Sequence, residues 1–251
     1  MKRNHFKRFA ALALSAVCGA ACLAGCGTQP TAATALETIQ QPKTGSYEDW
    51  ELIQQTRQEN PVSESTFTAL DHFAYTTAAQ VLGENADGSY SPLSLYYALA
   101  LAATGAAGET QTQMLDLLGI SDPAQLSDQC AKLYRLLSRD NEVGTMRLAN
   151  SLWMDQRVDW KQSFVTQAAQ DFYAEVYQVD FTTDEAPQAM AQWVAQQTGG
   201  LLTPTFQPTD QQVLSLLNTL YFTDEWYDRF QSKNTQSDTF TKADGSQAVS
   251  Y

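Results

Sequence analysis

The most informative segment of this sequence runs from Leu214 to Phe240 and begins Leu-Ser-Leu-Leu-Asn-Thr-Leu-Tyr-Phe-Thr-Asp-Glu-Trp-Tyr-Asp-Arg-Phe. Its first part, from Val213 to Phe222, is a nearly continuous apolar run without Gly or Pro, which predicts a strand buried on both faces. One amide, Asn218, lies in the middle of this run. Because an unpaired buried amide costs free energy, we expect Asn218 to find polar partners elsewhere in the fold.

The charge balance excludes one class of partner. The chain has 251 residues and a formal net charge of −13, and its first 25 residues contain four bases and no acid. Without those residues, 11 basic and 28 acidic residues remain, a net charge of −17. Nucleic-acid binding needs a cationic surface, so we expect no nucleic-acid partner.

The N-terminus has the organisation of an export signal. A basic segment, residues 2–8, precedes an apolar segment, residues 9–17, that is too short to cross a bilayer and is typical of a signal peptide. The segment ends in Leu23-Ala24-Gly25-Cys26, which resembles a bacterial lipobox, in which the Cys becomes the lipidated first residue. We therefore predict that residues 1–25 are a lipoprotein signal peptide and that Cys26 is the lipid attachment site. The protein is then expected to be exported and anchored to the cell membrane, facing outside the cytoplasm; a plain signal peptide with a chance Cys is the alternative.

The cysteine residues do not predict a disulfide framework. Cleavage before Cys26 leaves only that residue and Cys130 in the mature chain. Cys130 lies on the apolar face of a predicted helix, so we expect an inert core thiol.

Periodicity predicts an α+β domain at residues 51–251, preceded by a flexible tether at 26–50 that is rich in Thr, Gln, Ala and Pro. Ser91-Pro92 gives a strong helix start, and the helix that follows, Leu93 to Thr104, is apolar or small at nearly every position, which predicts burial all round. Further helices are expected at 51–57, 67–83, 109–118, 122–137, 161–173 and 184–198, and strands at 145–155, 174–181 and 213–222.

Several motifs together resemble the serpin family. The family signature Asn-Ala-Xaa-Tyr-Phe-Lys-Gly-Xaa-Trp, with later Phe, Thr and Phe, is matched by Asn218, Tyr221, Phe222, Trp226, Phe230, Thr235 and Phe240, with departures at Thr219, Thr223 and Asp224. Earlier matches are Ser91-Pro92-Leu93-Ser94-Leu95, Gly105-Ala106-Ala107-Gly108-Glu109-Thr110, Ala149-Asn150-Ser151-Leu152-Trp153 and the segment from Ala174 to Phe181. The matches follow the family order from about Phe67 to Phe240, and the chain is identified as a member of this family.

The resemblance implies a partial serpin fold, with N-terminal helices and strands of the main mixed β-sheet. It places Ser91, Ser94 and Asn218 in the family's shutter region, beneath the sheet where it opens, in a network that also uses a histidine from a later strand. It places Trp226 in the breach region, at the top of the sheet where the reactive-centre loop first inserts. Read from the residues alone, the two serines are a helix cap, Asn218 is a structural amide and Trp226 is a core aromatic; cap and network are compatible.

The resemblance implies suicide inhibition of serine, or sometimes cysteine, endopeptidases. A target endopeptidase attacks an exposed loop, and the cleaved loop inserts into the main sheet beside the strand at Val213 to Phe222. The reactive-centre loop is absent from these 251 residues, so we expect the chain as given to be an inactive N-terminal fragment. A non-inhibitory, surface-anchored binding protein and an inactive truncated product are the alternatives.

The residues favour no enzyme. After removal of the leader one histidine remains, His72, and there is no Gly-Xaa-Ser-Xaa-Gly elbow or Ser-Xaa-Xaa-Lys pair. No His/Cys spacing suits zinc, and no EF-hand or phosphate-binding loop is present, so no metal or cofactor is predicted.

Overall fold

The computed structural model describes residues 33–83 and 88–250, so the signal-peptide and Cys26 predictions lie outside the described residues. The helices are α1 (Trp50–Glu59), α2 (Glu64–Val81), α3 (Pro92–Gly105), α4 (Gly108–Leu118), α5 (Pro123–Leu137), α6 (Gln162–Asp171) and α7 (Glu185–Gln197), with one 3-10 turn, η1 (Ser232–Asn234). The strands are β1 (Thr34–Ala35), β2 (Arg139–Asp140), β3 (Thr145–Asp155), β4 (Ala174–Val179), β5 (Leu214–Thr223), β6 (Asp238–Thr241) and β7 (Gln247–Ser250). None of the described helices is both long and apolar enough to cross a membrane.

The main sheet is mixed and is built around β3. This strand pairs in parallel with β4 and antiparallel with β5, whose register runs from Thr145 opposite Thr223 to Met154 opposite Leu214. The short strand β1 pairs with the other edge of β4, and β2 forms a hairpin with the start of β3. The strand predicted at 213–222 is therefore present, as β5, at one edge of the described sheet.

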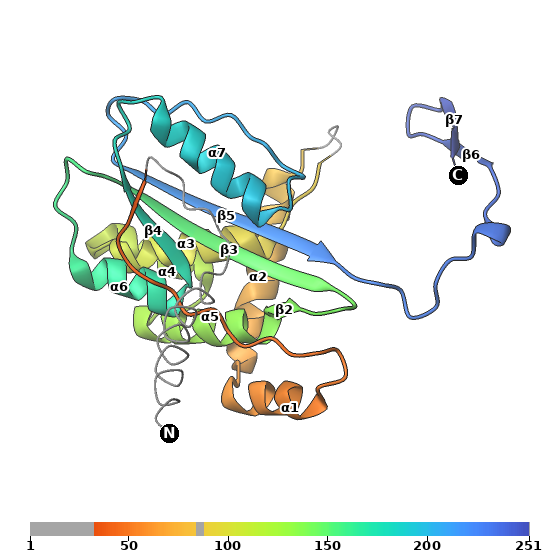
Figure 1. Ribbon diagram of the computed structural model, residues 1–251, viewed down its shortest axis with the longest axis horizontal. Coiled ribbons are helices and arrows are strands. Elements are labelled where there is room, and N and C mark those ends of the chain that lie inside the picture. Colours follow the sequence, from red (N-terminus) through yellow and green to blue (C-terminus); the bar gives the residue numbers. More distant parts are fainter. Residues whose placement is uncertain (1–32, 84–87, 251) are drawn as a thin grey trace, which may run out of the picture.

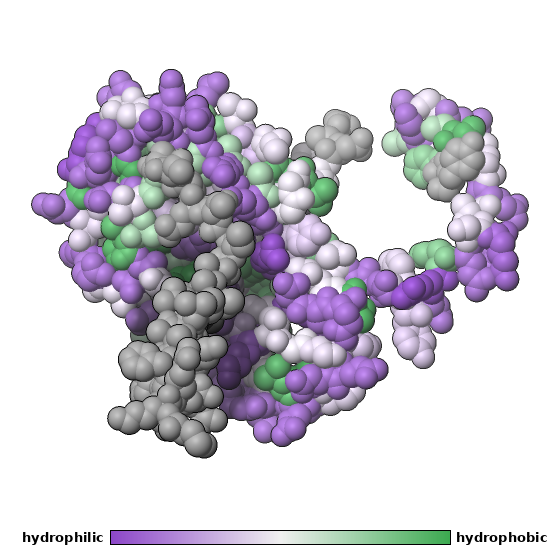
Figure 2. Space-filling view, viewed as in Figure 1, coloured by the Kyte–Doolittle hydropathy of each residue, from purple (hydrophilic) through white to green (hydrophobic). Residues whose placement is uncertain are grey.

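Helices cover the two faces of the sheet unequally (Figure 1). On one face, residues of α2 to α6 form the larger core with alternate side chains of β3, Leu148, Leu152 and Met154. On the other face α7 packs alone, with Trp193 buried against Ala149 and Trp153 of β3. Figure 2 shows hydrophilic residues over most of the surface above α7. The alternation of β3 side chains between two apolar layers explains why the strand is buried almost throughout.

Helix α3 departs from the expectation of burial all round. Tyr96, Tyr97 and Leu101 are fully buried, but Leu95 and Leu99 are only partly buried at the rim of the core. The sheet ends at β5 on this side, so the described residues do not cover the remaining surface of the helix.

The described part of the segment predicted as a flexible tether, residues 33–50, is attached to the sheet. Thr34 and Ala35 add β1 to the edge of β4, and the backbone N–H of Leu36 donates to the carbonyl of Val176 at 2.8 Å. Leu36 and Ile39 then pack against the larger core. Backbone groups at the edge of β4 and two apolar side chains hold this segment on the sheet. The apolar residues of the segment are spaced too irregularly to show a helix or strand period.

Beyond β5 the chain leaves the body of the protein and ends in the β6–β7 hairpin, which lies apart from the main sheet in Figure 1. Trp226 is 72% exposed, and Tyr227 and Phe230 are more exposed still, so the interpretation of Trp226 as a core aromatic is wrong. No described residue lies over this segment to bury its rings, apart from the edge-to-face contact of Trp226 with Phe230 at 6.1 Å between centroids.

Candidate functional site

The candidate site is the outer edge of β5. In the described sheet β5 pairs only with β3, so its other edge has no strand partner. The N–H of Asp155 donates to the carbonyl of Val213 at 2.9 Å. Because backbone hydrogen bonding alternates along an antiparallel pair, the backbone N–H and C=O groups of the odd-numbered residues of β5 point toward β3. The backbone groups of the even-numbered residues of β5, from Leu214 to Phe222, therefore point outward and are free to pair with another strand.

Asn218, at the middle of β5, is tied to β3 by its side chain. It lies opposite Asn150 in the register, and its Nδ2 donates to Oδ1 of Asn150 at 2.6 Å. The Asn150 side chain, 1% exposed, donates in turn to the carbonyl of Phe172 at 2.8 Å, where the chain passes from α6 to β4. One chain of amides thus connects β5, β3 and the start of β4.

The amide of Asn218 is only half satisfied. Its Oδ1 is buried and has no hydrogen-bond partner in the described part of the chain. An orphaned buried acceptor costs about 1–3 kcal/mol, so this oxygen is a place where a donor from an added strand would bind favourably.

Ser91 and Ser94, the two serines expected in the shutter region, lie at the start of α3. Ser91 is the N-cap, and its Oγ accepts from the N–H of Ser94 at 3.2 Å. Helix α3 packs beneath β5, but within the described residues no hydrogen bond joins either serine to Asn218. The direct partner of Asn218 is Asn150, a residue of the Ala149–Trp153 motif for which no role was predicted. An Asn inside an apolar strand was the signal that could have found it.

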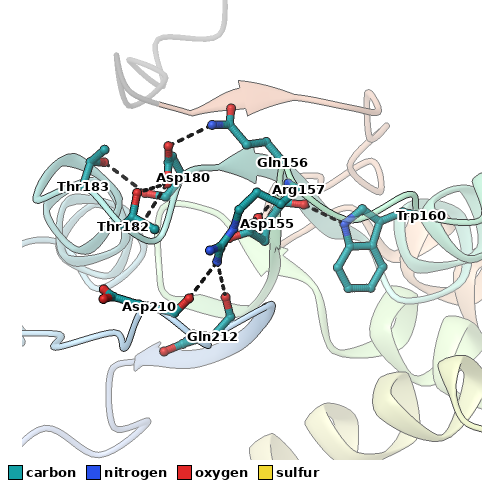
Figure 3. A network of polar contacts seen from close by, with 9 residues as sticks. All are labelled: Asp155, Gln156, Arg157, Trp160, Asp180, Thr182, Thr183, Asp210 and Gln212. Carbon is teal, nitrogen blue, oxygen red and sulfur yellow. Dashed lines mark hydrogen bonds and ion pairs between the residues drawn. The ribbon is translucent and has the colours of Figure 1, made fainter.

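A polar network fixes the first end of β5 (Figure 3). The fully buried carboxylate of Asp155 accepts two hydrogen bonds of 2.8 Å from the Arg157 guanidinium. The same guanidinium donates to the carbonyl of Asp210 at 3.0 Å, in the loop that leads into β5. The hydrogen bonds from Arg157 hold the pKa of Asp155 below its usual value.

The other end of β5 is fastened just before the chain leaves the body. Arg139 of β2 forms an ion pair with Asp224. The pKa of Asp224 is held below its usual value, first by the N–H of Glu225 and then by Arg139. Trp226 comes two residues after Asp224 and is exposed beyond the sheet. It therefore lies next to the end of β5. Both ends of β5 are anchored to neighbouring elements, whereas its long outer edge is open.

Comparison with known proteins agrees with this geometry. Residues 68–250 match the family model described as "Serpin (serine protease inhibitor)". The chain belongs to the serpin family. Serpins are in general protease inhibitors and not enzymes, and no group of three or more His, Cys, Asp or Glu side chains among the described residues could hold a metal ion.

Two curated relatives are longer than this serpin chain. It is 34% identical over 169 residues to Serpin-Z2B of Triticum aestivum, covering 64% of this chain and 42% of the relative. It is 27% identical over 199 residues to an uncharacterized serpin-like protein of Thermococcus kodakarensis, covering 76% of this chain and 45% of that one. The chain thus spans less than half the length of these curated relatives.

Solved structures show the same fold. The native, stressed conformation of Arabidopsis AtSerpin1 matches with a TM-score of 0.65 and 25% identity, over 77% of this chain and 50% of that one. The thermophilic serpin tengpin in its latent state matches with a TM-score of 0.69 and 22% identity, over 75% and 52%. The α+β serpin fold predicted from the sequence is therefore confirmed for the portion described.

Proposed function

We propose that this chain forms the N-terminal part of a serpin-type suicide inhibitor of serine or cysteine endopeptidases. The observation that carries the proposal is the open outer edge of β5, with the unpaired Oδ1 of Asn218 at its middle. A long unpaired edge with a waiting acceptor is suited to receive one more strand.

In the proposed reaction the nucleophile of the endopeptidase attacks the scissile carbonyl of a bait loop. The peptide bond breaks, its amine leaves with a proton supplied by the endopeptidase, and an acyl-enzyme ester or thioester remains. The cleaved loop then inserts against β5, where its backbone pairs with the outward groups of the even-numbered residues. Each new hydrogen bond contributes about 0.5–1.5 kcal/mol, and a donor to Asn218 removes the penalty of the orphaned acceptor.

The test begins with the coding DNA after the Tyr251 codon. An open frame supplies the longer protein, and a stop codon favours an inactive product. The longer protein and the 251-residue chain are each titrated against trypsin-, elastase- and subtilisin-like endopeptidases and run on denaturing gels. We expect a detergent-resistant covalent complex from the longer protein and none from the 251-residue chain, which contains no bait loop. A covalent complex with the 251-residue chain contradicts this, and no complex with either favours a non-inhibitory, surface-anchored binding protein.

We further propose that the mature protein begins at lipidated Cys26 and faces outside the cytoplasm. The support is the order of a basic leader, an apolar segment and Leu23-Ala24-Gly25-Cys26. Several acyl chains on one Cys suffice for stable anchoring, so the membrane would be a second partner beside the endopeptidase.

A further inference from the structure

A cavity of about 480 Å³ lies between α1 and the end of α5, outside the site at β5. Figure 1 shows α1 beside the lower end of the helical layer, joined to the sheet by the segment that follows β1. The walls are this segment near Lys43 to Tyr47, one side of α1, and the last turn of α5 with the residues just after it. Its volume is in the range of pockets that hold small organic ligands.

Cationic side chains gather in this cavity. Lys43, Arg57, Arg135 and Arg139 line it, with Asp49 as the one lining carboxylate, and Asp49 already accepts from the N–H of Leu52 at 3.0 Å. The whole chain has 28 acidic and 15 basic residues. Arg139 is already paired with Asp224, but three further cations against one engaged acid still give the cavity the opposite charge balance to the rest of the protein, which favours an anion there.

Much of this positive charge has no partner. The side chains of Lys43 and Arg57 form no hydrogen bond or ion pair with any residue in the described ranges. Nε of Arg139 is buried, also without a hydrogen-bond partner among them, while the Nη2 of the same guanidinium pairs with Asp224. Arg135 is held in place by Asn60 and by the hydroxyl of Tyr173, to which its Nη1 donates at 3.0 Å. A buried donor without a partner costs free energy that an acceptor oxygen on a ligand would recover.

The rest of the lining is mixed: the polar side chains of Thr44, Ser46, Thr56, Ser138 and Asn141 stand beside an apolar part. Leu52 and Ile53 of α1 face Leu136 of α5, and the rings of Tyr47 and Trp50 meet edge to face at 6.4 Å between centroids. Apolar walls bind the body of a ligand, and a few polar groups fix its orientation.

One wall of the cavity lies outside the region matched by the family model. The family match begins at residue 68, whereas the wall from Lys43 to Arg57 precedes it. Only the α5 side belongs to the matched region, so the N-terminal segment completes the cavity.

We propose that this cavity binds a small amphipathic organic anion, an aromatic or short aliphatic carboxylate. The carboxylate lies among Arg57, Lys43 and Nε of Arg139, and the apolar body lies against Trp50, Leu52 and Ile53. Attraction between the charges and burial of the apolar body act together, so neither an inorganic anion nor an uncharged analogue is a sufficient ligand.

The test uses 2-naphthoate, the uncharged 2-naphthalenemethanol and inorganic sulfate, each titrated into the purified protein by calorimetry. We expect saturable one-to-one binding of 2-naphthoate that weakens as salt is raised, and much weaker binding of the other two probes. The variant Lys43→Gln/Arg57→Gln removes two exposed, unpaired charges, so it should fold normally and bind 2-naphthoate at least about tenfold more weakly, because bonds to charged groups contribute about 1.5–3 kcal/mol.

The matched control is Lys161→Gln/Lys242→Gln, which changes the net charge equally at exposed positions away from the cavity. We expect this variant to bind 2-naphthoate as the unmodified protein does. The proposal is overturned if 2-naphthoate does not bind, if 2-naphthalenemethanol binds equally well, or if the two double variants lose affinity to the same extent.

Discussion

Nδ2 of Asn218 lies 2.6 Å from Oδ1 of Asn150, and the two residues are direct neighbours in the register of β5 and β3. Asn150 uses both ends of its amide, because its Nδ2 also donates to the carbonyl of Phe172. Asn218 uses only one end, because its Oδ1 has no partner among the described residues. The pair is therefore unequal, and the two amides should differ in what they contribute to stability.

We predict that Asn150→Leu lowers the free energy of unfolding more than Asn218→Leu. Replacing Asn150 leaves the Phe172 carbonyl and the Asn218 amide unpaired, at about 1–3 kcal/mol each. Replacing Asn218 leaves one acceptor unpaired but also removes an orphaned oxygen, so its cost should be smaller. Urea unfolding of the two variants measures the difference, and the reverse order would refute this account.

The N-terminal segment should contribute to stability through Leu36. Leu36→Asp places a charge against the core beside the bond from its N–H to Val176, and we expect a loss of about 1–3 kcal/mol. Gln40→Asp is the control, because that side chain is exposed. Urea unfolding and limited proteolysis measure both effects. Equal stability of the two variants would mean that the segment is not held on the sheet.

Asp155 should make stability depend on pH in the acid range. Its pKa is lowered in the folded protein by Arg157, so its stabilising contribution is present above its unfolded pKa of about 3.9 and is lost as pH falls through the folded value. We predict that Asp155→Asn is less stable than the unmodified protein at pH 7 and that the gap narrows below about pH 4.

Urea midpoints across pH measure this gap. Asp210→Asn is the control, because Asp210 is exposed and accepts from Arg157 through its backbone carbonyl only. A gap for Asp155→Asn that stays constant with pH would show that the carboxylate is not stabilised by its partner.

Gly144 should tolerate no side chain. A Cβ at this position would lie 2.6 Å from the carbonyl oxygen of Thr223, at the end of β5. We expect Gly144→Ala to cost about 1–3 kcal/mol by forcing β5 away from the turn before β3. Gly83→Ala, where a Cβ meets no described residue within 4 Å, should change stability by less than about 0.5 kcal/mol. Thermal unfolding distinguishes the two, and an unchanged Gly144→Ala protein would rule out the close approach.

For the proposed anchor, Cys26→Ala should leave the protein unprocessed or move it to the soluble fraction. The thioether that carries the lipid cannot form on Ala, so fractionation and intact mass report the change. Cys130→Ala should retain the wild-type distribution, because that thiol is buried in the folded domain. A Cys26→Ala protein that keeps both the membrane association and the mass of the wild type would exclude lipidation.

Local sequence patterns predicted helices α1 to α7 and strands β3, β4 and β5 in their correct order. The apolar run from Val213 to Phe222 gave a strand, Ser91-Pro92 gave a helix start, and the motifs in family order gave the serpin fold. These features depend on local spacing, capping and proline geometry, which neighbouring residues specify among themselves.

Contacts between residues far apart in the sequence were visible only in the folded chain. It selected Asn150 as the partner of Asn218, attached the segment at Leu36 to the sheet, and left Trp226 exposed. It also brought Arg57 and Arg139 to one cavity. The physical reason is that sheet register, edge pairing and the meeting of α1 with α5 depend on which surfaces remain uncovered after the core has packed, and no local pattern encodes that.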